Sequence, residues 1–343
     1  MSATGPPDAA ETPEVQARRL RNGIITLTVL VVLVVALLIA VPGLHGVGKV
    51  VTRMTPGWLA AAIALEILSC AGYVLIFLRV FDRAPIVFGA RVALTEMAFG
   101  AAVSLGGAGS LAIGAWLLRE SGVTLGEIAH RSGVLFLLTS AINAITLIGA
   151  GLLLGLGIVP GDSDPLLTLV PAGAGVLVVA FFLSLPRLTE NRSVARGDGR
   201  VAALVRGGAQ TIRDTRRALL KPDLRLLGAF AYLWCDIGVL WACFHATPHT
   251  PPIAVIVLAY QIGYLANVLP IPGNVGALEG GFVGMFVLYG ISATPAAAAA
   301  VVYHAIALWI PLTWGTIGFI RLRRSLHEPL VARQPRKRGS GAD

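Results

Sequence analysis

Long uninterrupted apolar runs are the feature that most constrains this sequence. The run 24-IITLTVLVVLVVALLIAV-41 is close to the roughly 20 apolar residues that cross a bilayer as a helix. Only 13% of the 343 residues are charged and 56% are hydrophobic, whereas about a quarter of the residues of soluble proteins are charged. A soluble fold could not bury so much apolar surface, so the sequence predicts an all-α polytopic membrane protein.

The formal net charge of +9 is explained by topology. Lys and Arg flank the apolar runs, and such residues collect in cytoplasmic loops. We therefore expect both termini in the cytoplasm, and the Ala-, Gly-, Val- and Arg-rich composition suggests the inner (plasma) membrane of a bacterium. No aromatic residues alternate with the basic ones, which argues against nucleic-acid binding and leaves anionic lipid headgroups as secondary contacts.

Loops and apolar runs divide the chain into two similar halves. We expect a disordered N-terminus (1–22), a first membrane repeat (23–157), an outer loop (158–165), a second membrane repeat (166–320) and a basic tail (321–343). The second repeat contains an Arg-rich cytoplasmic loop, 187–223. Each half reads as span, span, broken segment, span, and each crosses an odd number of times, so the two repeats have inverted topology.

The broken segments are the most unusual part of each half. The first is interrupted at 104-SLGGAGS-110 and the second at 270-PIPGNVGALEGG-281, which holds two prolines and four glycines. Re-entrant hairpins and paired full crossings both fit the charge pattern, and we favour hairpins. Paired breaks in inverted repeats are typical of transporters and point to the substrate site. The alternative is that these glycines only allow close helix packing.

Motifs of soluble enzymes are missing from the sequence. It has no P-loop, H-E-x-x-H, G-x-S-x-G or dinucleotide fingerprint, and no loop long enough for a separate core. The three cysteines all lie in apolar stretches and form neither a disulfide framework nor a metal motif. We therefore expect no enzymatic activity, no cofactor and no metal.

Polar residues at membrane depth are the best candidates for function, because each costs about 2.5–3.5 kcal/mol to insert. For Glu66 and Asp236, pairing with a neighbouring donor that fixes helix packing is an equal alternative. Arg91 has snorkelling to the headgroups as its alternative. The candidates are Glu66, Arg91, Glu96, Asp236, Glu279 and His304.

Glu279 is the sharpest candidate because it follows the Pro-Gly break. A helix that restarts there presents free N–H groups from Asn274 to Ala277, and helix N-termini commonly bind phosphate. Glu279 would then meet a cationic group or pair with His304, with bracing of the broken backbone as the structural alternative. The predicted substrate-binding residues are Pro272, Gly273, Asn274, Gly276, Glu279, His304, Tyr303, Arg91 and Glu96, and Tyr260 and Tyr264 could add hydroxyls.

The second broken segment resembles a known family. The stretch NVLPIPGNVGALEGGFVGMFVLYGI, followed by AAAAAVVYHAIALWIPLTWG, is similar to the signature of the lysylphosphatidylglycerol synthetase transmembrane region, the flippase-like UPF0104 family. The first break lacks the family's Pro-Gly-Arg-type turn, and the family often has Arg where this chain has His304. The resemblance implies a stand-alone member without the soluble synthase domain.

The resemblance implies movement of a phospholipid or a polyprenyl-linked lipid between leaflets, as in a flippase. A membrane partner that holds a lipid- or glycan-synthesising enzyme through loop 187–223 is the alternative. A membrane transferase is a weaker third reading, for which the acidic loop 157–165 is a thin candidate. Homo-oligomer formation is left open.

Overall fold

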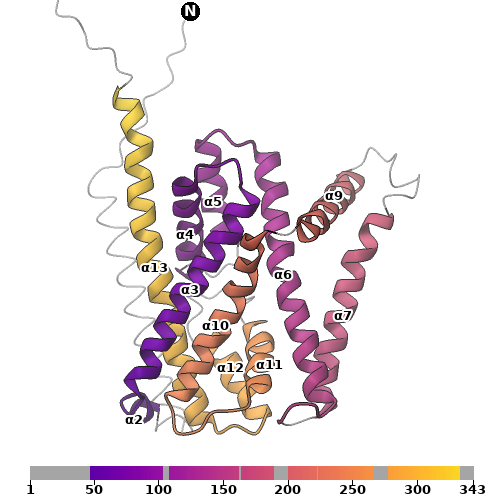
Figure 1. Cartoon of the computed structure of the whole chain (residues 1–343), viewed down its shortest axis with the longest axis vertical. Coiled ribbons are helices and arrows are strands. Elements are labelled where there is room, and N and C mark those ends of the chain that lie inside the picture. Colours follow the sequence, from indigo (N-terminus) through magenta and orange to yellow (C-terminus); the bar gives the residue numbers. More distant parts are fainter. Residues whose placement is uncertain are drawn as a thin grey trace, which may run out of the picture.

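The computed structural model describes residues 47–102, 108–161, 164–188, 200–221, 223–265 and 277–332. The described residues are helical, with turns between the helices and no strand among them (Figure 1). The apolar run 24–41 lies outside them, as do residues 104–107 of the first break and 270–276 of the second.

The helices of the N-terminal half occupy residues 47–155. They are α2 (Val47–Val51), α3 (Pro56–Val80), α4 (Ile86–Ala102), α5 (Ala108–Glu120) and α6 (Leu125–Gly155). Pro56 begins α3, where a proline costs no hydrogen bond, and Thr124 caps α6 by accepting from the Glu127 amide at 3.3 Å.

The helices of the C-terminal half occupy residues 165–332. They are α7 (Pro165–Leu188), α9 (Arg200–Leu220), a short 3₁₀ turn η2 (Leu224–Leu226), α10 (Leu227–His245), α11 (Ile253–Gly263), α12 (Ala277–Leu288) and α13 (Ala293–Ala332). Helix α9 lies within the Arg-rich segment 187–223, and α13 continues into the basic segment after residue 320.

Five described stretches are long and apolar enough to cross a membrane. They are Pro56–Val80, Leu125–Gly155, Pro165–Arg187, Leu224–His245 and Ala293–Leu322. Large apolar side chains such as Phe136, Leu177 and Phe181 are exposed on α6 and α7, as expected for surfaces that face lipid. The chain is therefore a multi-pass membrane protein with helical spans.

Helices α4, α5, α11 and α12 are shorter than these spans. Helices α11 and α12 have 11 and 12 residues, so at about 1.5 Å per residue neither crosses the roughly 30 Å hydrocarbon core. They pack on each other at one end of the bundle, while α4 and α5 pack on each other at the opposite end (Figure 1).

Helices α5 and α12 end in the same local structure. Gly122 (φ +92°) and Gly290 (φ +77°) take left-handed conformations that favour glycine. The amide of Val123 donates to the Leu118 carbonyl at 3.1 Å, and that of Ile291 donates to the Phe286 carbonyl at 2.9 Å. This is the Schellman geometry that stops a helix, and it turns the chain into α6 in one case and into α13 in the other.

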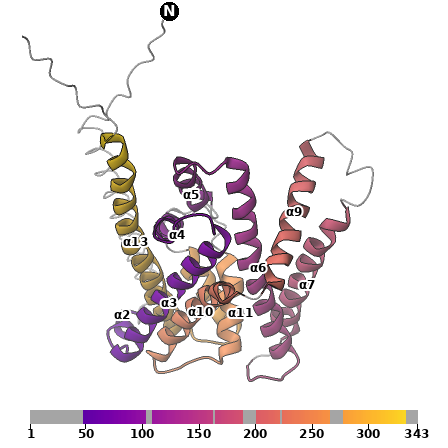
Figure 2. The ribbon, with the colours of Figure 1, turned by 45° about the horizontal axis from the view of Figure 1, so that its top comes forward.

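The centre of the bundle is the crossing of α3 and α10. Gly72 and Gly228 let the two backbones meet, since a Cβ on Gly72 would lie 2.6 Å from the Tyr232 nitrogen and 2.8 Å from the Gly228 oxygen. The largest apolar cluster packs next to this crossing and includes Phe244, Phe282 and Phe286. Figure 2 shows α6, α7 and α9 on one side of the centre and α13 on the other.

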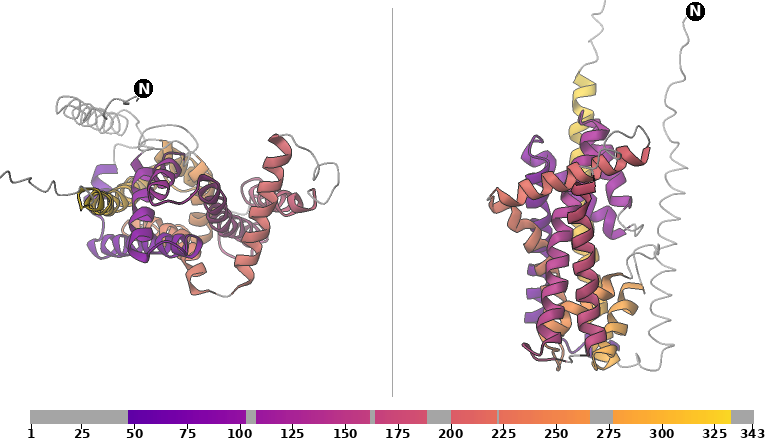
Figure 3. Two further views of the ribbon diagram at one scale, coloured as in Figure 1. Left: turned by 90° about the horizontal axis from the view of Figure 1, so that it is seen from above. Right: turned by 90° about the vertical axis from the view of Figure 1, so that its right-hand side faces the viewer.

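Arginines gather at the end of the bundle where α3 ends and α6 begins, which we call the basic end. Helix α9 lies there across α6 and α7 and packs on both (Figure 3). Arg131 of α6 closes the turn after α3, because its Nη1 donates to the Val80 carbonyl at 2.5 Å and to Asp82 at 2.7 Å.

Candidate functional site

Glu279 and His304 are in direct contact. Nδ1 of His304 lies 2.6 Å from Oε1 of Glu279, and only 10% of the His304 side chain and 15% of the Glu279 side chain are exposed. Glu279 stands in the first turn of α12 and His304 in the apolar part of α13. The pair thus joins the second broken segment to the last span.

Tyr303, the neighbour of His304, faces a different carboxylate. Its hydroxyl donates to the Asp236 carboxylate of α10 at 3.0 Å, and the Tyr260 hydroxyl of α11 donates to the same group. Tyr303 and Tyr260 are almost fully buried, while Asp236 keeps part of its surface accessible. Three helices are therefore joined at one carboxylate near the middle of α10.

Glu66 lies opposite Asp236, on α3. The two helices run antiparallel. Ser69 donates to the Tyr232 carbonyl at 2.9 Å, and the Leu65 side chain lies 3.3 Å from where a Cβ on Gly238 would be. These two contacts bracket Glu66 on α3 and Asp236 on α10, so the carboxylates face each other at one level.

Glu96 forms a separate buried contact nearer the basic end. It is 4% exposed, lies against Gly114 of α5, and accepts a hydrogen bond from the Tyr73 hydroxyl of α3 at 3.0 Å. Tyr73 packs in turn against Tyr232 of α10, with 5.2 Å between ring centroids and the two rings tilted by 55°. Aromatic rings thus connect the Glu96 contact to the α3–α10 crossing.

The predicted binding residues therefore lie in different places. Glu279 and His304 form one pair, Tyr303 points to Asp236, and Glu96 belongs to the first broken segment. Arg91 is half-buried on α4, where its backbone runs beside Gly318 of α13. The remaining four, Pro272, Gly273, Asn274 and Gly276, lie outside the described residues, and their phosphate-binding role stays a prediction.

The tyrosine pair on Asp236 was only partly anticipated from the sequence. Tyr260 and Tyr303 were expected near Glu279, but the residue they contact is Asp236. Tyr73 was missed altogether. The signal for it was weak, since an aromatic residue in an apolar span looks like any other core residue.

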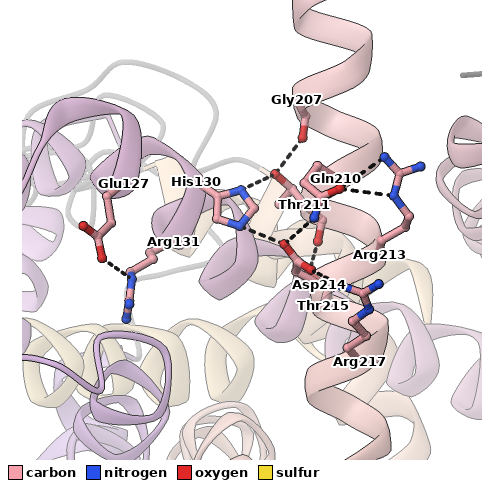
Figure 4. A network of polar contacts seen from close by, with 10 residues as sticks. All are labelled: Glu127, His130, Arg131, Gly207, Gln210, Thr211, Arg213, Asp214, Thr215 and Arg217. Carbon is pink, nitrogen blue, oxygen red and sulfur yellow. Dashed lines mark hydrogen bonds and ion pairs between the residues drawn. The ribbon is translucent and has the colours of Figure 1, made fainter. Parts of the chain in front are cut away.

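A second polar network lies at the basic end, between α6 and α9 (Figure 4). His130 of α6 contacts Asp214 at 3.1 Å through Nε2 and Thr211 at 3.3 Å through Nδ1. Asp214 also pairs with Arg217 at 3.3 Å. These contacts hold α9 on α6 and leave arginines such as Arg216 and Arg217 exposed.

Metal binding finds no support in the described part of the chain. No group of three or more His, Cys, Asp or Glu side chains there has the arrangement to hold an ion. The polar centre instead consists of carboxylates, tyrosine hydroxyls and one imidazole inside a bundle of apolar helices. The fold and the site together define a polytopic helical membrane protein with ionisable groups at membrane depth.

Comparison with known families shows to which family of membrane proteins the chain belongs. Residues 25–315 match the family described as the lysylphosphatidylglycerol synthase TM region, so the chain belongs to that family. A UPF0104 membrane protein of Methanothermobacter thermautotrophicus is 34% identical over 114 residues. That match covers 33% of this chain and 32% of the relative, so the matched part spans about a third of the relative's length.

Proposed function

We propose that this protein moves a phospholipid or a lipid-linked headgroup between the leaflets of the membrane. The observation that carries the proposal is the Glu279–His304 pair. Its 2.6 Å contact between Oε1 and Nδ1 joins the short helix α12, which follows the second break, to the full span α13. A pair of ionisable groups in an apolar bundle is costly, so it is expected where charge is handled.

An inverted repeat is the architecture that suits this function. The packing contacts support it if the four helices of the first half, α3 to α6, are matched in order with α10 to α13 of the second half. Helices that pack on each other then have counterparts that also pack on each other. Thus α4 packs on α13 as α11 packs on α6, and α3 packs on α10. The matched glycine stops after α5 and α12 add local support.

Alternating access follows from such symmetry. Short helix pairs that enter from opposite ends would be re-entrant hairpins, and a substrate would be held between them. The phosphate of the lipid would bind the N–H groups before α12. Glu279 would bind a cationic headgroup, or its contact with His304 would break and re-form during transport.

A leaflet assay tests this proposal. Purified protein in liposomes that contain a fluorescent phospholipid is expected to expose the inner-leaflet label to an external quencher. Glu279→Gln is expected to lower the initial rate at least about tenfold, because a charge-assisted contact worth at least about 1.4 kcal/mol is lost. Glu120→Gln, at an exposed carboxylate that ends α5, is the matched control.

Two results would remove the proposal. One is a wild-type protein that moves neither phospholipids nor polyprenyl-phosphate analogues. The other is a Glu279→Gln variant that matches the Glu120→Gln control.

A non-transporting partner of a synthetic enzyme is the second candidate. The observation in its favour is α9, whose exposed arginines lie on a helix that is fixed to α6 by the His130–Asp214 contact. Co-purification with such an enzyme, lost when residues 189–221 are replaced by a Gly/Ser linker, would favour this candidate over lipid movement.

A further inference from the structure

Glu66 is the least satisfied polar side chain of the bundle core. It is 3% exposed, and its Oε2 has no hydrogen-bond partner among the described residues. Its Oε1 has only the Cys70 thiol, at a sulfur–oxygen distance of 3.7 Å. A buried polar atom without a partner needs an explanation, because its desolvation costs about 1–3 kcal/mol or more for a charged group.

Asp236, the carboxylate that faces Glu66, has the opposite environment. It accepts hydrogen bonds from the hydroxyls of Tyr260 and Tyr303, and such bonds stabilise an ionised carboxylate. The two carboxylates also act on each other electrostatically. Two like charges that interact in an apolar interior repel each other, so the pair favours holding one proton.

Two other ionisable side chains of the packed helices have contacts of their own: His304, which follows Tyr303 on α13, contacts Glu279 at 2.6 Å, and Glu96 of α4 accepts from Tyr73. Arg91 of α4 lies where its backbone runs beside Gly318 of α13. The groups around the pair itself are thiols and phenols, which are neutral or would add negative charge. They are Cys70 and Tyr73 of α3, Tyr232 and Cys235 of α10, Tyr260 of α11, Tyr264 after α11, and Tyr303 of α13.

We propose that Glu66 and Asp236 form a proton-binding site at the α3–α10 crossing, with the resident proton on Glu66 and the charge on Asp236. Protonation removes the charge of Glu66, whose Oε2 has no hydrogen-bond partner among the described residues, and the tyrosine hydroxyls stabilise the charge of Asp236. A consequence for lipid movement, in which protonation favours one conformation of the bundle, rests on the proposed function.

Carbodiimide labelling tests the site without any transport assay. Dicyclohexylcarbodiimide is apolar and adds to a protonated carboxyl group, and the product rearranges to a stable acylurea that mass spectrometry can place on a residue. In the wild-type protein in lipid nanodiscs near pH 7, we expect at least about tenfold more adduct on Glu66 than on the exposed control Glu120. The Glu66 adduct is expected to fall as the pH is raised.

Substituted proteins distinguish a proton that Glu66 and Asp236 share from a Glu66 that is protonated only because it is buried. Asp236→Asn removes the neighbouring charge, so the Glu66 adduct should fall at any given pH. In the doubly substituted Tyr260→Phe, Tyr303→Phe protein, Asp236 loses its donors and should gain adduct at the expense of Glu66. Both variants are compared at equal recovery of folded protein by size-exclusion chromatography.

Three outcomes would overturn the proposal. They are a wild-type protein with no adduct on Glu66, adduct on Glu66 no greater than on Glu120, and a Glu66 adduct that Asp236→Asn leaves unchanged. The wild-type measurement requires no variant to fold. A protein that labels as expected but moves no lipid would contradict the proposed function and leave the proton site standing.

Discussion

Single residues at membrane depth carry most of the chemistry of this protein. Glu279, Asp236, Glu66 and Glu96 each lie among apolar helices, and each has a different environment. His304 contacts Glu279, two tyrosine hydroxyls donate to Asp236, and the Tyr73 hydroxyl donates to Glu96. Among the described residues, Glu66 has only the Cys70 thiol. Carboxyl groups at membrane depth therefore have different surroundings in this protein, and the donors around each group decide how far its ionised form is stabilised.

The Glu279–His304 contact is expected to be measurable as a coupling energy. His304→Leu should lower the free energy of unfolding by about 1–3 kcal/mol, because it leaves a buried Glu279 oxygen without this donor. Reversible unfolding in mixed micelles, followed by tryptophan fluorescence, gives the value.

A double-mutant cycle isolates the pair. If the contact stabilises the fold, Glu279→Leu combined with His304→Leu should cost less than the sum of the single substitutions by about 0.5–3 kcal/mol. Strict additivity of the two substitutions would argue against a stabilising pair.

Asp82 predicts a pH dependence at the basic end. The hydrogen bond from Arg131 lowers the pKa of the Asp82 carboxyl below its usual range. The folded pKa is below the unfolded one, so the stabilisation is present above the unfolded pKa, about 3.9, and is lost as the pH falls through the folded pKa. The effect should be small, because 57% of the Asp82 side chain is exposed.

Thermal unfolding of Asp82→Asn and wild-type protein checks this dependence. The difference in Tm should be constant from about pH 7 to about pH 5 and should vanish in more acidic buffer. A difference that grows in acid would contradict the assigned direction of the shift.

At the scale of elements, the crossing of α3 and α10 depends on glycine. A methyl group at Gly72 would overlap the backbone of α10, which cannot move aside as a flexible side chain can. Glycines also allow a close approach between α6 and α7, where Gly151 and Gly155 lie against Thr168 and Leu169.

Gly72→Ala is expected to destabilise the protein by about 1–3 kcal/mol, because the added carbon forces α3 and α10 apart. Gly149→Ala in α6 is the control, since a Cβ there meets nothing within 4 Å. Alanine is the better helix former, so Gly149→Ala should be neutral or stabilising by up to about 1 kcal/mol. Equal loss of Tm in the two variants would show that the close crossing does not limit stability.

At the scale of the whole molecule, charge predicts the orientation in the membrane. The basic end carries Arg79, Arg131 and α9, whereas the opposite end carries the turn after α10 and the turn after α6. We expect the basic end in the cytoplasm, because Lys and Arg are retained on that side during insertion.

Cysteine labelling in intact cells checks the orientation. In a background without the three native cysteines, Thr250→Cys should react with a membrane-impermeant maleimide added outside. Gly126→Cys, at the basic end, should react only after permeabilisation; both positions are exposed. The reverse pattern would place the basic end outside.

Amino-acid composition and pattern alone determined that this chain is a helical membrane protein. Apolar length is a local property, and five described stretches have the length and composition to cross a membrane. Family membership was also readable, because the Pro-Gly break and Glu279 are contiguous in the sequence.

Only the tertiary structure decided which polar groups meet. Glu279 and His304 are 25 residues apart, and Tyr303 and Asp236 are 67 apart, so no periodicity relates them. Their contacts depend on how α10, α11, α12 and α13 pack, and the Glu66–Asp236 arrangement depends on a crossing that two glycines allow. The positions of the membrane spans depend on whether each stretch of sequence faces lipid or water, which is a local property. The hydrogen-bond partners of the polar side chains depend on packing between helices that are distant in the chain.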